Sequence, residues 1–295
     1  MVNKSTLKNQ FCELTGTSLS TAARYMDQAD YNIAQAVDLY YNKHPSHAPL
    51  HASAKPSSNS YSAKLVAIYD KYKDVDNNEI IDIEGTIRYL EDLKIDPDNA
   101  RALSLAFLLN SKKTGVFQRD CFLQVWSKYK IETLSAMSSF ITKFHNDICY
   151  NRGEYYDLAG NSLRFKKLYD FTFGFLVESE GQKVLDLEIA TGYWQLLLPI
   201  VVDAHLENQQ VGEEKESIRA KVDERIMQWV EFLNSKPRKV ISFDTWSMFL
   251  PFFQEVVLSD PWKFSGYDEM AAWPSKIDEY IEHLYDNDLL QNKEY

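Results

Sequence analysis

The chain has 295 residues, a formal net charge of −11 and an isoelectric point near 5.1. Its hydrophobic share of 45% is large enough to fill a core, which excludes a disordered chain. The excess of carboxylates disfavours binding to nucleic acid or to an anionic membrane surface and favours a basic protein partner. Because single cores tend to split beyond about 250 residues, we expect two domains.

The sequence shows no segment that predicts targeting to or across a membrane. No apolar run approaches the roughly 18 residues that cross a bilayer as a helix. The N-terminal stretch MVNKSTLKNQFCEL also lacks the apolar core of a signal peptide. We therefore expect a protein of the cytoplasm, the nucleus or both.

The cysteines predict neither catalysis nor metal binding. Cys12, Cys121 and Cys149 are odd in number and widely separated, and each falls within a helical apolar pattern. Such positions are typical of small core residues and not of a disulfide framework or a zinc cluster. We expect no cofactor and no metal site, and we predict that the chain has no catalytic residues of its own.

Three short helical patterns occupy residues 1–43. Apolar residues recur at helical spacing in each pattern, and turn-forming residues at 15–17 and 30–32 separate the patterns. Asn32 and Gln35 match a capping box at the start of the third pattern. These features predict a compact three-helix bundle.

A linker is predicted at residues 44–62. The stretch HPSHAPLHASAKPSSNSYS contains three prolines and lacks apolar periodicity, so it cannot bury enough surface to offset the cost of ordering. It also contains His44, His47 and His51, but their spacing fits no closed metal site. We interpret the stretch as a solvated tether between two domains.

Helical patterns continue from residue 63 to residue 288. Apolar residues recur at i, i+3, i+4 and i+7 through about ten segments, without a convincing alternating strand pattern. Residues 203–224 are polar and weakly periodic, and we expect an exposed connection or a helix extension there. The predicted fold class is all-α, with the three-helix bundle followed by a larger helical domain.

The stretch DVDNNEIIDIEG, which begins at Asp74, resembles a twelve-residue calcium-binding loop. Asp74 and Asp76 stand at the first and third positions, where such a loop supplies oxygen ligands. The sixth position needs a glycine for a sharp turn but is Glu79, and the twelfth needs a bidentate glutamate but is Gly85. The positions that shape and close the ion cage are therefore both unsuitable.

A second loop of the same type follows in the stretch NSKKTGVFQRDC. The turn glycine is present at Gly115, but Lys112 and Cys121 replace the ligands of the third and twelfth positions. Two such helix–loop–helix units in tandem predict a degenerate EF-hand-like scaffold and not an ion sensor. Ile81 and Phe117 stand at the eighth positions, and we expect them to join the two loops.

Four further stretches resemble one known family. They are DLKIDPDNARALSLAF (92–107), LDLEIATGYWQLLL (185–198), SFDTWSMFLPF (242–252) and YDEMAAWPSKIDEYIE (267–282). Together with the degenerate loop pair they are similar to the defective-in-cullin-neddylation family. The resemblance implies a potentiating-neddylation (PONY) domain at residues 63–288, and residues 1–43 resemble a ubiquitin-associated (UBA-like) domain that binds ubiquitin.

The resemblance implies the function of a scaffold-type E3 ligase for cullin neddylation. Members of the family bind the C-terminal winged-helix region of a cullin. They also hold the E2 conjugating enzyme that carries the neddylation modifier, without catalytic residues of their own. The UBA-like domain implies ubiquitin or the modifier itself as a further partner.

The cullin-binding patch implied by the resemblance falls on Asp244, Ala272 and Asp278. Asp278 lies on the polar face of an amphipathic helical pattern and should face water. Asp244 begins another helical pattern, where a carboxylate can also cap free N–H groups, so capping is an alternative role for it. Ala272 would let a partner side chain approach closely.

The second implied site is an apolar pocket for the N-acetylated N-terminus of the E2 enzyme. Most of the matching positions are apolar, as such a pocket requires, but helical residues of this kind are equally typical of a core. The matching positions are Ile83, Thr86, Ala102, Leu103, Leu105, Leu109, Phe117, Phe175 and Leu196.

Two other classes of function remain open from the sequence. One is a calcium-regulated interaction protein, which titration with calcium would test. The other is a ubiquitin-receptor adaptor in which the N-terminal bundle dominates, and removal of residues 1–45 should then destroy activity. The scaffold interpretation instead predicts that residues 62–295 suffice for cullin modification.

Overall fold

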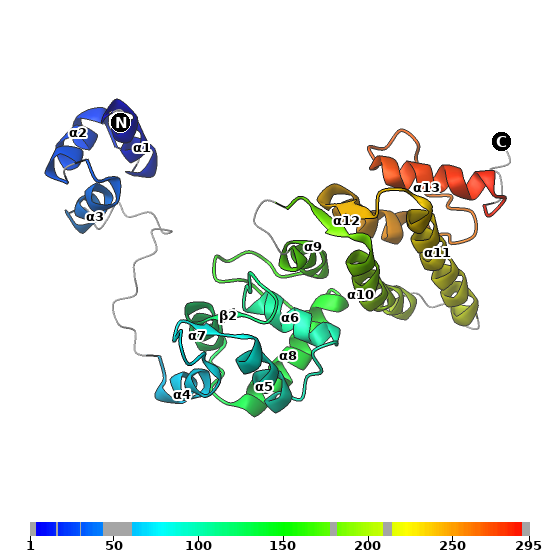
Figure 1. The fold of residues 1–295 in the computed structure, drawn as a ribbon, viewed down its shortest axis with the longest axis horizontal. Coiled ribbons are helices and arrows are strands. Elements are labelled where there is room, and N and C mark those ends of the chain that lie inside the picture. Colours follow the sequence, from blue (N-terminus) through cyan, green and yellow to red (C-terminus); the bar gives the residue numbers. More distant parts are fainter. Residues whose placement is uncertain are drawn as a thin grey trace. The chain divides into compact units, whose positions relative to one another are not determined.

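The computed structural model describes residues 4–15, 17–29, 31–43, 61–177, 182–208 and 214–290. They belong to two compact units, Met1–Ser60 and Tyr61–Tyr295 (Figure 1). Of the linker predicted at residues 44–62, only the last two residues are described, and they lead directly into a helix. The rest of the predicted linker lies outside the described residues.

The N-terminal unit contains three helices: α1 (Lys4–Thr15), α2 (Leu19–Gln28) and α3 (Ile33–Lys43). Its core is an aromatic cluster in which the ring of Tyr25 lies 6.1 Å from that of Phe11 and 5.4 Å from that of Tyr40. At the start of α3, the N–H of Gln35 donates to Asn32 Oδ1 at 3.3 Å, as a capping residue should. The predicted three-helix bundle is confirmed.

The larger unit begins with α4 (Ala63–Tyr72), β1 (Ile80–Ile81), α5 (Ile83–Asp92), α6 (Ala100–Leu108), β2 (Phe117–Gln118), α7 (Arg119–Lys128) and α8 (Leu134–Cys149). Strands β1 and β2 pair antiparallel, with Ile81 opposite Phe117. Both of these side chains are buried in the main core. The predicted contact between the two loops is therefore confirmed, and it joins two helix–loop–helix units.

The first loop directs its polar groups toward its own backbone. The carboxylate of Asp74 accepts hydrogen bonds from the N–H groups of Asp76 and Asn77. At the end of the loop, Gly85 packs so closely against α4 that a β-carbon would overlap the carbonyl oxygen of Tyr72. Helix packing therefore requires this glycine. Across the described ranges, no cluster of three or more His, Cys, Asp or Glu side chains is placed to hold a metal ion.

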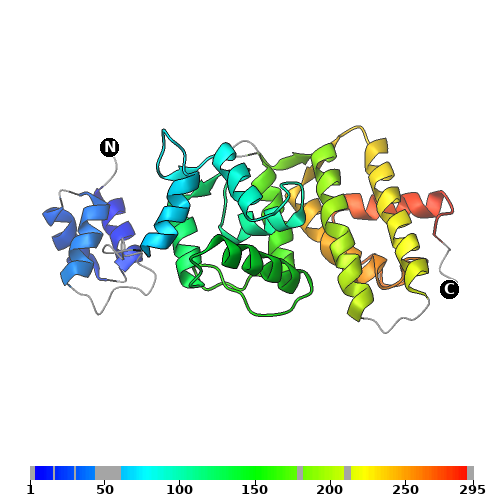
Figure 2. The same cartoon turned by 90° about the horizontal axis from the view of Figure 1, so that it is seen from below.

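The rest of the larger unit contains α9 (Phe165–Leu176), β3 (Val184–Asp186), α10 (Leu187–Asn208), α11 (Lys215–Ser235), β4 (Val240–Ser242), α12 (Phe243–Phe252), the π-helical segment η2 (Phe253–Val257) and α13 (Ser275–Asp286). Strands β3 and β4 pair antiparallel with Leu185 opposite Ile241. Each strand runs directly into a helix, and because the pair is antiparallel, α10 and α12 begin at opposite ends of the two-strand ladder. Helices α10 and α11 run side by side (Figure 2).

Buried aromatic residues hold α9, α10 and α12 together. The indole rings of Trp194 and Trp246 stack with their centroids 5.3 Å apart. Both indole N–H groups donate to Tyr169, that of Trp194 to the phenol oxygen at 2.7 Å and that of Trp246 to the backbone oxygen at 2.8 Å. Because these buried polar groups are paired, the aromatic core gains packing without a desolvation penalty at these atoms.

The structure adds short strands to the predicted all-α fold. Strands of two or three residues are too short to show alternation, so the sequence pattern could not reveal them. The described part of the polar segment 203–224 continues α10 and begins α11, while residues 209–213 lie outside the described residues. Among the helices that the structure describes, none is long and apolar enough to cross a membrane.

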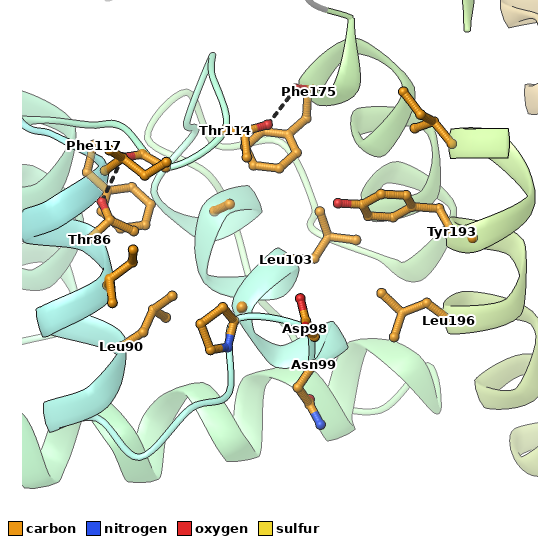
Figure 3. A pocket seen from close by; sticks show the side chains of 18 of the residues that line it. Thr86, Leu90, Asp98, Asn99, Leu103, Thr114, Phe117, Phe175, Tyr193 and Leu196 are labelled. Carbon is orange, nitrogen blue, oxygen red and sulfur yellow. Dashed lines mark hydrogen bonds between the residues drawn. The ribbon is translucent and has the colours of Figure 1, made fainter. Parts of the chain in front are cut away.

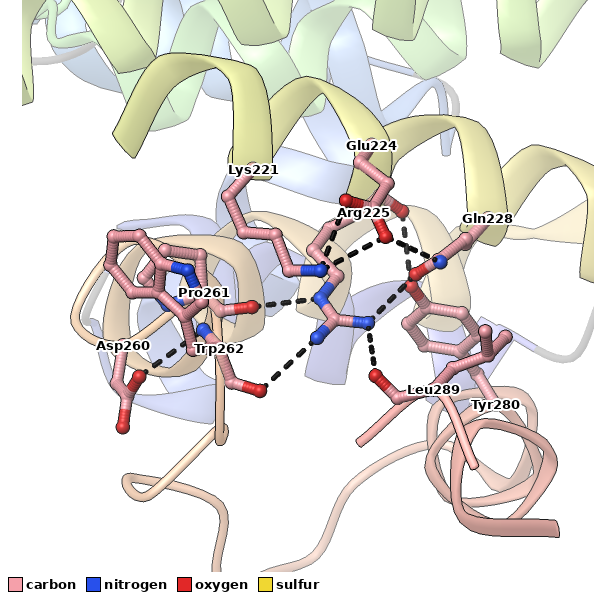
Figure 4. Close-up of polar contacts among 9 residues, drawn as sticks. All are labelled: Lys221, Glu224, Arg225, Gln228, Asp260, Pro261, Trp262, Tyr280 and Leu289. Atoms are coloured by element: carbon pink, nitrogen blue, oxygen red, sulfur yellow. Dashed lines mark hydrogen bonds and ion pairs between the residues drawn. The ribbon is translucent and has the colours of Figure 1, made fainter. Parts of the chain in front are cut away.

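Arg225 is a buried cation that joins α11 to the segments on either side of α13 (Figure 4). Its guanidinium donates to the carbonyl oxygens of Pro261 at 2.7 Å, Trp262 at 3.1 Å and Leu289 at 3.0 Å. A buried charge needs such partners because its desolvation is costly. Leu290 is also buried, so the packing continues two residues beyond the predicted end of the domain at residue 288.

Candidate functional site

The larger unit contains an apolar cavity of about 720 Å³ (Figure 3). Its walls come from α5, α6, the end of α9, the start of α10 and the second loop. Thr86 and Leu90 of α5 face Tyr193 and Leu196 of α10 across the cavity, with Leu103 of α6 between them (Figure 3). A mostly apolar hollow of this size is typical of a ligand-binding site.

Seven of the nine residues that the sequence placed in an apolar pocket line this cavity, and two do not. Leu105 and Leu109 are 0% and 1% exposed and belong to the hydrophobic core. Leu105 projects from a different face of α6, and Leu109 lies beyond the last residue of that helix. Their assignment to the pocket is therefore corrected. The residues that line the cavity are Ile83, Thr86, Ala102, Leu103, Phe117, Phe175 and Leu196.

Sequence reasoning missed several lining residues on α5 and α10. Ile87 and Leu90 follow Ile83 at i+4 and i+7, and the i, i+4 spacing also relates Ile189 to Tyr193. Helical periodicity could have found them once one cavity residue on each helix was known. Ile83, Ile87 and Ile189 are exposed although they are large and apolar, and a group of exposed apolar side chains is typical of interaction surfaces.

Two threonine hydroxyls fix the second loop at the edge of the cavity (Figure 3). Thr86 Oγ1 donates to the carbonyl oxygen of Gly115 at 2.9 Å, which ties α5 to the loop. Thr114 Oγ1 donates to the carbonyl oxygen of Phe175 at 3.4 Å, which ties the same loop to the end of α9. Both hydroxyls are hydrogen-bonded within the wall, so they do not make the lining strongly polar.

The charged residues in the lining of the cavity are Asp98 and Glu188. Both are exposed, so they stand at its mouth and not on its apolar walls. Burial, with a further contribution from the negative charge of Asp98, raises the pKa of Tyr193. The cavity therefore combines apolar walls with a negatively charged mouth.

Asp244 lies in the first turn of α12 and is exposed. The cap of this helix is Ser242, whose hydroxyl oxygen accepts from the N–H of Thr245 at 3.1 Å. The alternative role of Asp244 as the capping residue is therefore wrong. Its carboxylate faces solvent, and the N-terminal end of a helix favours a negative charge there.

Asp278 lies in the first turn of α13 and is half-buried. Its Oδ1 accepts a hydrogen bond of 2.8 Å from the hydroxyl of Tyr267, which is itself buried. Ala272 is exposed in the turn before α13, and next to it Trp273 packs edge-on against Phe252 with ring centroids 5.7 Å apart. Since α12 and α13 also pack together, we call Asp244, Ala272 and Asp278 the acidic patch.

A half-buried histidine next to Cys149 also escaped the sequence analysis, although the i, i+4 spacing places both residues on one face of α8. His145 Nδ1 lies 3.7 Å from Cys149 Sγ and 2.8 Å from Ser104 Oγ on α6. Burial lowers the pKa of His145 to about 4 and raises the pKa of Cys149 to about 12. The imidazole is therefore neutral and the thiol protonated, which describes a structural contact between α6 and α8 and not an activated nucleophile.

The fold and the two sites define a helical protein-interaction protein with a separate three-helix unit. Residues 150–283 match a family model described as cullin binding, and residues 6–46 match a model described as a UBA-like domain. The acidic patch lies entirely within the first match. Of the residues that line the cavity, Phe175 and Leu196 lie within the range of the cullin-binding match, whereas helices α5 and α6 precede that range.

Similar proteins cover almost the whole chain. It is 47% identical to defective in cullin neddylation protein 1 of Candida albicans over 98% of this chain and 100% of that protein. It is 31% identical to the protein of the same name from Yarrowia lipolytica, over 92% of each chain. It is 27% identical to the protein of the same name from Saccharomyces cerevisiae, over 94% of this chain and 92% of that protein. The chain belongs to the defective in cullin neddylation protein 1 family.

Proposed function

We propose that this protein acts in cullin neddylation as a scaffold-type E3, which holds a cullin and the modifier-charged E2 enzyme together. The names of its relatives and the cullin-binding model support the cullin partner. The observation that carries the scaffold role is the presence of two chemically different surfaces on one folded unit. An apolar cavity and a separate acidic patch suit two different ligands.

The acidic patch suits the cullin. Asp244 and Asp278 lie in the first turns of α12 and α13, and the small exposed side chain of Ala272 before α13 would leave room for a long basic side chain to approach. Charge-assisted hydrogen bonds to lysine or arginine of a cullin winged-helix region contribute about 1.5–3 kcal/mol each when the interface excludes water. The hydroxyl of Tyr267 already orients Asp278, which lowers the entropy lost on binding.

The apolar cavity suits the N-terminal residues of the E2 enzyme. A terminal methionine side chain fills an apolar hollow well because it is unbranched and polarizable. An acetyl group on that terminus removes the positive charge, so apolar walls can surround the chain end without a large desolvation cost. Exposed Ile83 and Ile87 would be covered by such a ligand.

The proposed mechanism is positioning. Transfer requires the lysine of the cullin to approach the bond between the modifier and the E2 cysteine. Holding both partners on one rigid unit raises their effective concentration and restricts their orientation. This accelerates the reaction without any chemical group from this chain, so the protein is proposed to have no catalytic residues or cofactor of its own.

We further propose that the N-terminal unit binds ubiquitin or the neddylation modifier, which its UBA-like match supports. The cytoplasm and the nucleus are the proposed locations. In this arrangement the N-terminal unit adds affinity for modified partners, and the larger unit performs the positioning.

Reconstituted cullin modification tests the proposal. Purified cullin and charged E2 are mixed with and without this protein, and the initial rate of modification is followed. We expect an increase of about tenfold or more at concentrations below saturation, unaffected by a calcium chelator. Residues 61–295 should suffice for this increase, which separates the scaffold from a ubiquitin-receptor adaptor. An unchanged rate at concentrations where the partners bind would refute the scaffold role.

A further inference from the structure

A second cavity of about 740 Å³ adjoins the apolar one. Glu188, Gly192 and Gln195 of α10 line both cavities. All three residues are exposed, so the boundary between the two cavities is the solvent-facing surface of α10 and not a buried wall. A ligand that fills one cavity therefore has a direct path into the other.

Gly192 is the shared lining residue that has no side chain. A β-carbon at this position would have no heavy atom within 4 Å, so packing within the unit does not require glycine here. Glycine also disfavours a helix interior, since it loses more conformational freedom on folding than any other residue. Glycine at this position leaves the path between the cavities open. No contact within the unit gives another reason for a glycine here.

The two cavities differ in polarity. In addition to the shared residues, the second is lined by four polar or charged residues and one apolar residue: Asp186, Thr191, Asn234, Lys239 and Leu187. The ammonium group of Lys239 donates to the carbonyl oxygen of Asn234, and Asp186 Oδ1 accepts from the N–H of Glu188 at 2.9 Å. The carboxylates of Asp186 and Glu188 are both exposed, so the polar cavity presents more negative than positive charge.

We propose that the apolar and polar cavities form one groove over Gly192. The apolar cavity takes the N-terminal anchor of the bound segment, and the polar cavity takes the stretch that follows it. That stretch carries lysine or arginine, which faces Asp186 and Glu188. The inference rests on the proposed binding of an E2 N-terminus and adds a requirement for basic residues after the apolar anchor.

Three synthetic peptides test this groove with the full-length protein. The first is an anchor alone, an acetylated methionine followed by four apolar residues. The second and third add a tail of eight residues that contains either four lysines or four glutamates. We expect the lysine tail to tighten binding about fivefold over the anchor and the glutamate tail to weaken it, since two exposed ion pairs contribute modestly. Raising the salt concentration should reduce both effects.

Substitutions distinguish the groove from general attraction between charges. Gly192→Gln should remove the advantage of the lysine tail over the anchor, because the new side chain blocks the path. Gly174→Gln is the matched control, since Gly174 is also an exposed helical glycine with no heavy atom within 4 Å of a β-carbon, and it should preserve that advantage. Asp186→Asn keeps an acceptor for the N–H of Glu188 but removes the charge. It should weaken binding of the lysine tail without changing binding of the anchor.

The outcomes separate this inference from the proposed function. If no peptide binds, the proposed role of the apolar cavity fails, and the groove fails with it. If the anchor binds but the two tails bind equally, the groove is refuted while the apolar site stands. A lysine-tail advantage that survives Gly192→Gln would likewise overturn the path over α10.

Discussion

In the proposed function, the apolar cavity and the acidic patch bind their ligands through different interactions. Burial of apolar surface provides the affinity of the cavity, which depends little on salt. Charged contacts provide the affinity of the acidic patch, so screening by salt weakens this affinity unless the partner excludes water. The cavity is fixed by hydrogen bonds inside its wall, such as that from Thr86 to Gly115, whereas the patch depends on orienting single carboxylates such as Asp278. One unit can therefore hold two partners whose affinities respond independently to conditions.

Reversing the charge of the acidic patch should have the largest effect, and only on cullin binding. The double variant Asp244→Lys and Asp278→Lys removes two charge-assisted contacts and adds repulsion, so cullin affinity should fall more than about 100-fold. Binding of an acetylated peptide to the cavity should not change. Calorimetry with the cullin winged-helix region measures the loss. The control variant carries Asp76→Lys and Glu91→Lys, which make the same change of charge at exposed positions elsewhere. Unchanged cullin binding by the variant of Asp244 and Asp278 would contradict the role of the acidic patch.

Acid should weaken the contact between α8 and α6, the helix that forms one wall of the cavity. The pKa of His145 is about 4 in the folded state and near 6.5 in the unfolded chain, so the unfolded chain binds more protons between these values. Stability contributed by neutral His145 is therefore present above pH 6.5 and is lost as the pH falls toward 4. The loss is about 2 kcal/mol at pH 5. Denaturant unfolding from pH 7 to pH 5 measures it, and His145→Gln should flatten this part of the profile.

A charge placed in the cavity wall should affect only the apolar site. Ile83 lines the cavity and is 57% exposed, so Ile83→Lys should leave folding largely intact. Loss of apolar contact together with desolvation of the ammonium group should weaken binding of the acetylated peptide by about tenfold or more. Fluorescence anisotropy measures this. Val75→Lys is the control, because Val75 is 95% exposed and does not line the cavity, and equal losses in both variants would argue against the site.

The smallest expected effect concerns the orientation of Asp278. Tyr267→Phe removes the hydrogen bond from the phenol hydroxyl, which contributes about 1 kcal/mol, so cullin affinity should fall about fivefold. Binding at the cavity should stay constant. Tyr129→Phe is the matched control, since it also removes a phenol hydrogen bond, donated to the carbonyl oxygen of Tyr156, far from the patch in the fold. Wild-type cullin affinity in Tyr267→Phe would show that Asp278 needs no such support.

Sequence periodicity predicted the features that depend on local spacing. The contact between Ile81 and Phe117 followed from equivalent positions in two loops. Amphipathic spacing correctly kept Asp278 off the apolar face of α13, but this side chain is half-buried against Tyr267 and does not simply face water as predicted. Assigning Leu105 to the cavity failed because an apolar pocket wall and a core have the same composition. Only the angle at which α6 packs decides which of its apolar faces remains accessible, and that angle depends on contacts between distant segments.

Two other features needed the structure for a similar reason. The cap of α12 could be Ser242 or Asp244 by residue type, and the backbone geometry at the helix start selects Ser242. His145 and Cys149 are correctly spaced on α8, but whether they activate each other depends on their burial. Residue identity limits the possible roles, and the environment selects among them.

Gly85 limits how the first loop can change by mutation. The single substitution Gly85→Glu would supply the missing ligand of a calcium loop, but its β-carbon would overlap the backbone of α4. Ion binding at this loop would therefore require α4 and α5 to move apart near Gly85, and Ile83 lies two residues earlier on α5. Since Ile83 forms part of the cavity wall, such a movement would also change the shape of the apolar cavity. An ion site in this loop and the present shape of the neighbouring cavity are therefore difficult to combine.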